Sequence, residues 1–338
     1  MNKSLKRGFV ISFCLFCAFP PSPEADEPLK RPPPFFGLFS FSLETTVGFL
    51  YGQGEEIVYK NNSDKYLSEL LWDLKPLLYY GAALSFEARA PSWPVGFYTD
   101  LSVKMGISGR SGIIEDRDWL HKEKDYMTHY SRHDNYIEDA RFFDWDLGAA
   151  FRLNPGGAFN PALSLFWRFS YMELRWLSRD GYIQYGANSG LSGSSLIPWE
   201  DSFSKSETPG PGIQYTQMWI LASPGVAASF PISSFFALDC AFTVSPFIRA
   251  AAEDLHLLKN TQFEDSIQGG LALEPEIRVF FFPNSRCSLS LRVSWRSIRG
   301  TKGYSRFKTA GAETYSPGGA SGAGFHALDT GISFKVYF

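Results

Sequence analysis

Two short segments of the sequence carry side chains able to activate a water molecule. Asp116 and Asp118 stand two residues apart in "IIEDRDWLHKEKDYMTHYSRHD", and Asp254 and His256 stand two apart in "AAAEDLHLLK". Residues two apart on a β-strand share a face, so each pair would point in one direction if its segment continues a strand. Two close carboxylates cannot both ionise easily, and such a pair can hold and polarise a water. A carboxylate that orients an imidazole is the usual arrangement of a general base.

The composition of the chain restricts the scaffold that could position these pairs. The 338 residues are 17% aromatic and 20% charged, with a formal net charge of −3. This charge offers no basic surface, so we expect no nucleic-acid partner. Apolar and polar residues alternate with a period of two in most segments, which is typical of β-strands with one apolar and one polar face. Beyond residue 25, no apolar run approaches the ~18 residues expected of a transmembrane helix.

Short breaks and long polar segments alternate along the chain. The short breaks are rich in Pro, Gly and Asn and fall at 90–96, 154–160, 231–234 and 283–286. The longer polar segments fall at 60–66, 115–138, 186–212, 256–265 and 303–323. Tight turns at one end and long loops at the other are typical of outer-membrane β-barrels.

This alternation predicts an all-β protein, a ten-stranded antiparallel transmembrane β-barrel. The expected strands are 39–59, 67–88, 97–114, 139–153, 161–185, 213–230, 235–255, 266–282, 287–302 and 324–338. Several of them exceed the ~9–11 residues that cross a bilayer. The barrel is therefore expected to extend above the outer membrane on the side of the long loops.

The N-terminal segment resembles a secretory signal. Lys3, Lys6 and Arg7 precede an apolar stretch that is too short to span a bilayer, and Ala25 is the expected cleavage position. We therefore expect a signal peptide at 1–25, an extended lead-in at 26–38 and the barrel at 39–338. The remaining cysteines, Cys240 and Cys287, are too few for a disulfide framework and are expected to be unpaired.

The strand phase predicts where the two pairs point. Odd positions of the third expected strand face lipid, so Asp116 and Asp118 should face inward. Even positions of the seventh expected strand, Ile248 included, are expected to face lipid, and strict alternation would send Asp254 and His256 outward. A β-bulge at 250–252 would reverse the phase, and bulges are frequent at barrel rims and active sites.

Several motifs, taken in order, resemble those of the omptins, a family of ten-stranded outer-membrane endoproteases. They are "EDRDW" followed by "SRHD", then "EDLH", then "RGTKGYS" and the C-terminal strand, and the resemblance covers about residues 43–338. It implies that Asp254 and His256 form a dyad that deprotonates water, which Asp116 and Asp118 hold from the opposite wall. The water attacks the peptide directly, without a metal, a cofactor or a covalent intermediate.

The resemblance also implies supporting and substrate-binding residues. Ser131 and His133 would support the site, and the active site would face the exterior and act on extracellular peptides or proteins. Glu56 matches the first pocket glutamate of a family that prefers substrates with basic residues at the cleavage point. The family's second pocket carboxylate is replaced here by Ala252, which weakens the case for strict selection of Arg or Lys. Glu253 would compensate only if it faces inward.

A contact with lipid is expected on the outward face of the fifth expected strand. Tyr171, Glu173 and Arg175 resemble the Tyr-x-Glu-x-Arg motif with which omptins contact lipopolysaccharide, and an interfacial ion pair is an equal interpretation. Met218 and Glu264 stand near the positions of the family's other basic contacts. The sequence therefore argues against a dependence on lipopolysaccharide as activator, although contact with outer-membrane lipid is expected.

Two other functions remain open at this point. A barrel of the same lineage that no longer cleaves could act as an adhesin or a host-protein receptor, and the altered pocket favours that alternative. A porin would need an open lumen. The four catalytic positions favour the first interpretation, an outer-membrane aspartyl-type endopeptidase.

Overall fold

The structure is a computed structural model, and it describes residues 38–60, 63–89, 93–153, 160–186, 196–283, 285–309, 312–315 and 319–338. The expected signal peptide (1–25) and all of the expected lead-in except Leu38 lie outside the described residues. No helix among the described residues is long and apolar enough to cross a membrane.

The described chain is built of antiparallel strands, so the predicted all-β class is confirmed. There are sixteen strands: β1 (Phe39–Tyr59), β2 (Tyr66–Ala88), β3 (Val95–Gly106), β4 (Gly109–Asp118), β5 (His129–Arg152), β6 (Ala162–Tyr185), β7 (Ser206–Glu207), β8 (Pro211–Pro231), β9 (Phe236–Ser245), β10 (Phe247–His256), β11 (Thr261–Gln268), β12 (Leu271–Phe281), β13 (Cys287–Arg299), β14 (Lys302–Thr309), β15 (Ala312–Tyr315) and β16 (Ser321–Tyr337).

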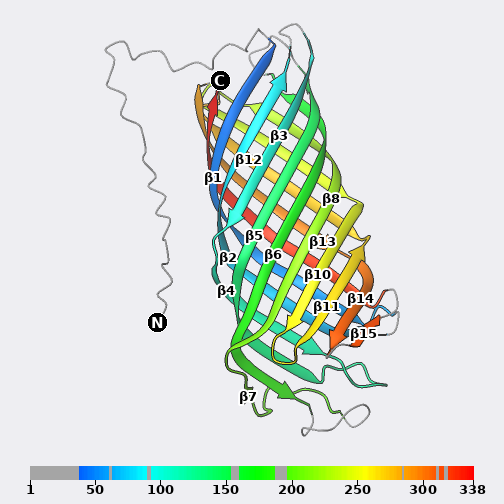
Figure 1. The fold of residues 1–338 in the computed structure, drawn as a ribbon. Coiled ribbons are helices and arrows are strands. Elements are labelled where there is room, and N and C mark those ends of the chain that lie inside the picture. The colour runs from blue at the N-terminus through cyan, green and yellow to red at the C-terminus, as the bar shows by residue number, and fades with distance from the viewer. Residues whose placement is uncertain are drawn as a thin grey trace.

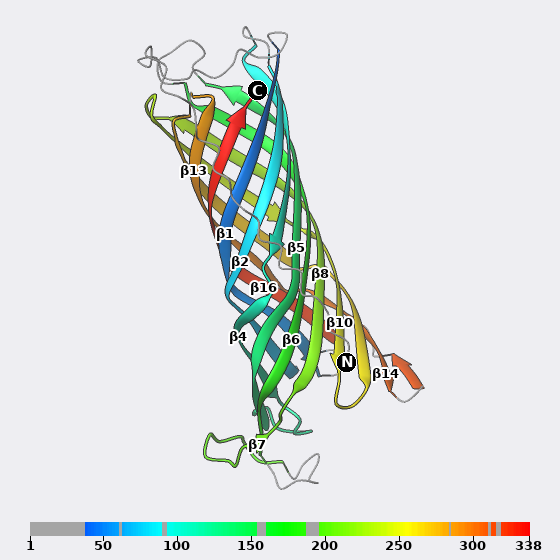
Figure 2. The same cartoon turned by 60° about the vertical axis from the view of Figure 1, so that its left-hand side comes forward.

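The strands close into a barrel (Figures 1 and 2). Followed from neighbour to neighbour, the ring is β1, β2, β3, β5, β6, β8, β9, β12, β13 and β16, and it closes because β16 pairs with β1 and β6 pairs with β8. Further along the barrel, β4, β10, β11 and β14 take the places of β3, β9, β12 and β13. Ten positions at each level are consistent with ten expected strands, four of which are interrupted.

Three of the expected loops are largely strand, and this corrects the prediction. β14, β15 and the start of β16 cover most of the expected segment 303–323. β4 reaches Asp118 and β5 begins at His129, so only 119–128 of the expected segment 115–138 lies outside a strand. Likewise β10 ends at His256 and β11 begins at Thr261. The error has a physical reason. This part of the wall carries polar side chains on its outer face, so polarity there does not mark a loop.

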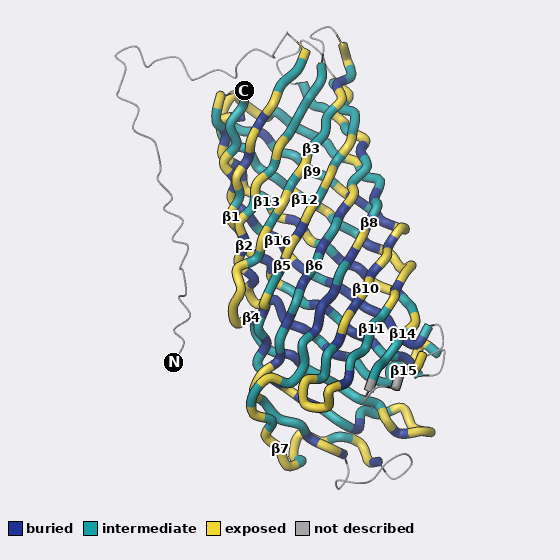
Figure 3. Tube along the Cα trace, viewed as in Figure 1, coloured by how far each residue is buried: buried dark blue, intermediate teal, exposed yellow. Residues whose placement is uncertain are grey.

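The outer face carries a belt of exposed apolar side chains toward the end of the barrel where Phe338 lies, and exposed and buried residues alternate along the strands (Figure 3). We call it the apolar belt; it includes Leu43, Val47, Phe49 and Tyr51 on β1, Leu289, Leu291, Val293 and Trp295 on β13, and Leu328, Ile332 and Phe334 on β16. Beyond it the outward residues become polar, with Gln53 and Glu55 following Tyr51. The apolar belt marks the membrane-crossing level, and the opposite end, with β7, β14 and β15, extends beyond it.

The lumen at the level of the apolar belt is filled by paired charges. Arg168 donates two hydrogen bonds of 2.8 Å to the carboxylate of Asp146, and Lys104 and Arg292 each lie 2.7 Å from Asp329. The cavity found among these side chains has a volume of only about 20 Å³. Paired charges therefore occupy the described lumen at this level, which argues against the porin alternative.

Candidate active site

Asp116 and Asp118 lie on the last residues of β4 and point to the inner wall. Ser68 on β2 is the register partner of Asp118, and its hydroxyl donates to Oδ1 of Asp116 at 3.4 Å. Ser131 on β5 is the register partner of Asp116 and donates to Oδ2 at 3.5 Å. The period of two on β4 thus places both carboxylates on one face, with a hydroxyl from each neighbouring strand beside Asp116.

Both carboxyl groups are half-buried on this wall. Desolvation raises the pKa of Asp116 well above its usual range, and the neighbouring charge of Asp118 raises it further. Desolvation also raises the pKa of Asp118, although Ser68 opposes the shift. A shared proton is the natural state of such a pair. The pair can therefore both donate a hydrogen bond and accept one.

Asp254 and His256 end β10 on a neighbouring part of the same mouth. Nε2 of His256 lies 2.8 Å from Oδ2 of Asp254, and the ring of Phe263 on β11 contacts the imidazole edge-on at a centroid distance of 5.4 Å. Asp254 is buried, and its Oδ1 is without a hydrogen-bond partner. The imidazole is thus oriented by a carboxylate and packed against a ring, and Nδ1 remains for another partner.

The inward direction of this pair corrects the expected position of the bulge. Pairing with β8 and β11 is unbroken from Ala250 to His256, so there is no bulge at 250–252. The phase changes at Pro246 instead: four steps from Thr243 to Phe247 match three steps on β8. Proline lacks the N–H that a ladder needs and is typical of such irregular positions. Ile248, expected to face lipid, is consequently buried inside the barrel.

The two pairs are electrostatically coupled across the mouth. The charge of Asp254 contributes to the raised pKa of Asp116, and a charge on His256 would lower the pKa of Asp118. The pKa of each aspartate on β4 therefore depends on the charge of one member of the β10 pair. The structure brings all four of these residues to one place, although they come from segments more than a hundred residues apart in the sequence.

Ser131 and His133 continue the site along β5. Nε2 of His133 lies 3.2 Å from Oγ of Ser131, and its Nδ1 lies 3.3 Å from Oγ1 of Thr208. His133 is buried, and desolvation lowers its pKa. The imidazole is therefore neutral at physiological pH and holds Ser131 beside Asp116. Thr208 was not predicted, because nothing in its sequence context marks it.

The expected substrate-binding residue, Glu56, is buried on the inner wall of β1. Desolvation raises its pKa well above the usual range, and the charges of Asp254, Asp265 and Asp116 add to the shift. Glu253, in contrast, is exposed on the outer face of β10 and accepts a hydrogen bond of 2.7 Å from Gln262. It cannot compensate for Ala252.

Asp265 is a further carboxylate of the mouth that the sequence prediction missed. It is the register partner of Ala252, on the adjacent strand β11. Desolvation raises its pKa to about 6. Its segment was predicted as a loop, although Phe263, Asp265 and Ile267 alternate with polar neighbours and would have indicated an inward carboxylate.

An aromatic layer closes the barrel beneath the site. Trp72 stacks on Tyr215 with ring centroids 5.1 Å apart, Trp176 lies 5.8 Å from Tyr215 and 6.1 Å from Trp72, and all three side chains are fully buried. Tyr215 is also the register partner of Asp254. The layer separates the mouth from the charged lumen below. Among the described residues, no group of three or more His, Cys, Asp or Glu could hold a metal ion.

The expected lipid-contact residues lie on the outer wall, as predicted from the strand phase. The Tyr171 hydroxyl donates to Oε2 of Glu173 at 2.5 Å. Glu173 is the register partner of both Arg141 and Met218. No ion pair within 4 Å joins Glu173 and Arg175 in the described chain, so the interfacial pair considered from the sequence does not form between them.

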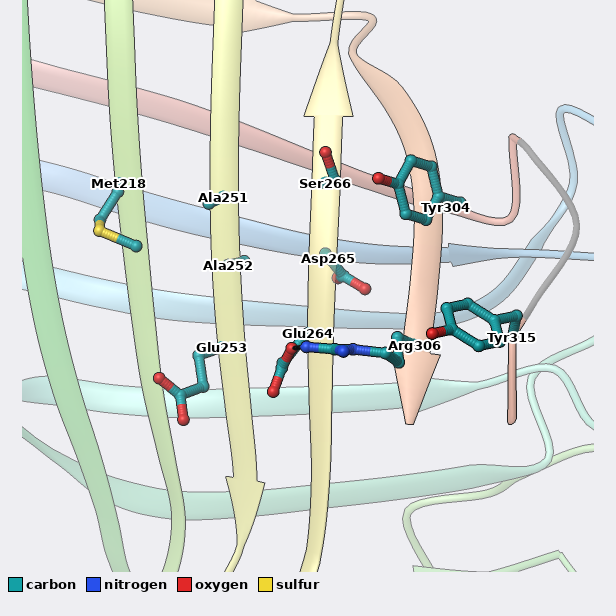
Figure 4. Close-up of a pocket in the computed structure, with 10 residues that line it drawn as sticks. All are labelled: Met218, Ala251, Ala252, Glu253, Glu264, Asp265, Ser266, Tyr304, Arg306 and Tyr315. Atoms are coloured by element: carbon teal, nitrogen blue, oxygen red, sulfur yellow. Dashed lines mark hydrogen bonds and ion pairs between the residues drawn. The ribbon is translucent and has the colours of Figure 1, made fainter. Parts of the chain in front are cut away.

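Two cavities adjoin this part of the outer wall. One, of about 600 Å³, is lined by Tyr171 together with Arg249 and Lys302. The other, of about 510 Å³, is shown in Figure 4 and includes Met218 and Glu264 among its lining residues. Glu264 forms ion pairs with Arg306 and Lys308 on β14. Its negative charge is therefore compensated within the wall.

The sequence and the fold of this chain are similar to those of known proteins. The sequence profile of the omptin family matches residues 38–338. The plasminogen activator of Yersinia pestis is 23% identical over 235 residues, which is 68% of this chain and 67% of that protein. The crystal structure of the outer membrane protease OmpT from Escherichia coli is similar in fold, with a TM-score of 0.74, 16% identity, and coverage of 92% of this chain and 99% of that one.

Proposed function

This chain belongs to the omptin family of outer-membrane proteases, and we propose that it is an endopeptidase whose site faces the exterior and hydrolyses extracellular peptides or proteins with an activated water. The observation that carries the proposal is the hydrogen bond of 2.8 Å between His256 and Asp254, at a mouth shared with Asp116 and Asp118. An oriented imidazole beside a carboxylate pair has the groups that direct hydrolysis of an amide requires.

In the proposed mechanism, His256 is the general base. Its Nε2 is engaged by Asp254, so Nδ1 accepts a proton from water, and Asp254 stabilises the imidazolium that forms. The water oxygen bonds to the peptide carbonyl carbon and the carbonyl electrons move to its oxygen. When the tetrahedral intermediate collapses, the C–N bond breaks and the imidazolium returns its proton to the leaving amine.

The aspartate pair holds the water and responds to the charge that develops. Burial and the charge of Asp118 raise the pKa of Asp116, which favours a shared proton, so the pair can donate a hydrogen bond while its other oxygens accept one. Ser131 positions Asp116, and the neutral His133 positions Ser131. We assign the last two a supporting role and no nucleophilic role.

Glu56 supports a preference for basic residues beside the scissile bond. A buried carboxylate without a basic partner is expensive, and a bound guanidinium or ammonium group would stabilise it. Tyr171, Glu173 and Arg175 are proposed to contact outer-membrane lipid. Because Met218 and Glu264, which line the cavity that Figure 4 shows, stand near the positions of the family's basic contacts, we expect cleavage to proceed without lipopolysaccharide.

The test is cleavage of an internally quenched peptide library by detergent-refolded protein, with and without lipopolysaccharide, beside the His256→Ala variant. We expect cleavage next to Arg or Lys that is lost in the variant. Cleavage elsewhere would keep the mechanism and reassign the pocket. If a folded barrel cleaves nothing under either lipid condition, the chain is instead a non-catalytic adhesin or receptor.

A further inference from the structure

Two carboxylates of the mouth, Glu56 and Asp265, are not explained by the water-activating groups. Oε2 of Glu56 and Oδ1 of Asp265 are buried atoms without a hydrogen-bond partner. Neither residue forms an ion pair with a lysine or arginine in the described part of the chain. Buried carboxylates in proteins are normally paired or hydrogen-bonded. Glu56 and Asp265 are therefore without a positively charged partner among the described residues.

Asp265 takes the place next to the position where a carboxylate is missing. Ala252 precedes Asp254 by two residues on β10 and shares its inward face, and Asp265 stands directly opposite Ala252 on β11 (Figure 4). The buried Ile267 lies two residues further along the same face of β11, whereas Ser266 is exposed. The inward carboxylate thus stands on β11, directly across the strand pair from Ala252 on β10.

Small side chains stand beside both Glu56 and Asp265 on the strands that separate them. At this level β16 and β14 separate β1 from β11. The register partner of Glu56 on β16 is Ala323, and the partner of Asp265 on β14 is Ser305, which hydrogen-bonds to it. The charge of Asp265 contributes to the raised pKa of Glu56, so the two carboxylates act on each other across these strands.

We propose that Glu56 and Asp265 together form the specificity pocket, with Asp265 in place of the carboxylate absent at Ala252, and that they bind the guanidinium or ammonium group of a basic substrate residue beside the scissile bond. The inference rests on the proposed function. A cation placed between two carboxylates makes charge-assisted hydrogen bonds to both, and a neutral side chain leaves both uncompensated.

The preference should weaken in acid. Desolvation, with the charge of Asp254 adding to it, raises the pKa of Asp265 to about 6, so the group is ionised at pH 7.5 and largely protonated at pH 5. The titratable groups coupled to its charge are Asp254 on β10, Glu56 on β1 and Tyr215 on β8, all acidic or neutral. Arg306 on β14 lines the same cavity as Asp265 but pairs with Glu264. A bound cation favours the ionised form and would release a proton from Asp265.

The test compares two quenched peptides that differ only in arginine or citrulline before the scissile bond. The ratio of their kcat/KM values cancels the shared dependence on His256. For the folded full-length protein at pH 7.5, we expect Asp265→Asn to lower this ratio about 10-fold or more. Adding Ala252→Asp to that variant should restore it. Glu253→Gln, which changes an outward carboxylate beside Ala252, should leave it unchanged.

A binding measurement separates this inference from the proposed function. Calorimetry with a reduced-amide arginine peptide, which cannot be cleaved, should show about 10-fold weaker binding to Asp265→Asn and proton release on binding to the wild type. An unchanged arginine-to-citrulline ratio, or unchanged binding, would overturn the role of Asp265. If the wild type cleaves neither peptide yet binding still depends on Asp265, the proposed endopeptidase function fails and the cation pocket stands.

Discussion

The lumen and the mouth of this barrel both enclose many ionisable side chains, but they compensate them differently. In the lumen, acids meet bases: Arg296 lies 2.7 Å from Glu274, and Arg292 and Lys104 share Asp329. At the mouth, carboxylates meet one another. Of the five inward carboxylates there, only Asp254 has an ionisable base as a partner, and that base is His256. No lysine or arginine of the described chain forms an ion pair with the others.

This difference indicates that the charges of the lumen stabilise the fold, whereas the carboxylates of the mouth are arranged to bind a ligand. A buried charge is tolerated when the attraction of an oppositely charged partner offsets its lost hydration, as in the lumen. At the mouth, burial instead raises the pKa values of Glu56, Asp116 and Asp118, which favours their neutral forms. Raised pKa values of clustered acids are typical of functional sites. Changes in the two regions should therefore have opposite effects on stability.

The largest effect is expected in the lumen. Asp329→Asn should lower the free energy of unfolding by about 3–5 kcal/mol, because it leaves Lys104 and Arg292 without their shared carboxylate. Denaturant titration of the refolded barrel would measure it. Asp125→Asn, which removes a half-exposed partner of Lys65, is the control and should change little. Equal effects of the two variants would remove the distinction between lumen and surface.

At the mouth, loss of activity should accompany a gain of stability. Asp116→Asn should lower kcat/KM about 100-fold or more, since the pair no longer holds water correctly. The same change should raise the free energy of unfolding, because a neutral amide is less costly to desolvate than a carboxylate. Glu115→Gln, on the outer face of the same strand, should leave kcat/KM within about twofold. If Asp116→Asn destabilises the fold, the mouth is structurally equivalent to the lumen.

The third effect is a dependence of stability on pH. The folded state raises the pKa of Asp265 to about 6, above the usual value near 4, so it binds more protons than the unfolded state within that window. The stability contributed by the protonated group is therefore present below about pH 4 and is lost as the pH rises through about 6. The difference in the free energy of unfolding between the wild type and Asp265→Asn (wild type minus variant) should fall by roughly 1–3 kcal/mol from pH 4 to 7. Parallel stability curves for the two proteins would contradict the shift, and Glu253→Gln serves as the matched outward control.

Alternation could predict the face of Asp116 and Asp118, because the even positions of their segment do point inward. It could not predict the face of His256. One proline changed the phase, and whether Pro246 sits in a regular strand or a bulge depends on the partner strand β8. Asp265 was missed for a related reason. Above the apolar belt both faces of a strand carry polar residues, so composition no longer separates strands from loops.

The pairings that join distant segments were also beyond the sequence pattern. Local periodicity could indicate that β4 and β10 each carry a pair of functional residues. It could not give the charge coupling between Asp116 and Asp254, because that depends on how the ring closes. The family resemblance implied that the two pairs face each other. It also predicted a pocket carboxylate at the position of Ala252 and gave no indication of Asp265 on the neighbouring strand.

The smallest effect concerns a second histidine with similar contacts. His326 lies on the outer face of β16, with Nδ1 at 2.9 Å from Oγ of Ser297 and Nε2 at 3.2 Å from Oε1 of Glu55. It has a serine and a carboxylate as partners, but it stands just beyond the apolar belt and faces away from the mouth. His326→Gln should therefore leave kcat/KM within about twofold and change the free energy of unfolding by less than about 1 kcal/mol.

His256→Gln, the matched change at the mouth, should lower kcat/KM by about 100-fold or more because glutamine cannot act as the base. Peptide cleavage and denaturant titration of both variants would measure the contrast. A histidine that merely bonds to a carboxylate is then insufficient for hydrolysis; it must also face the aspartate pair across the mouth. Loss of cleavage in His326→Gln, with the barrel still folded, would place the chemistry on the outer wall and reverse this conclusion.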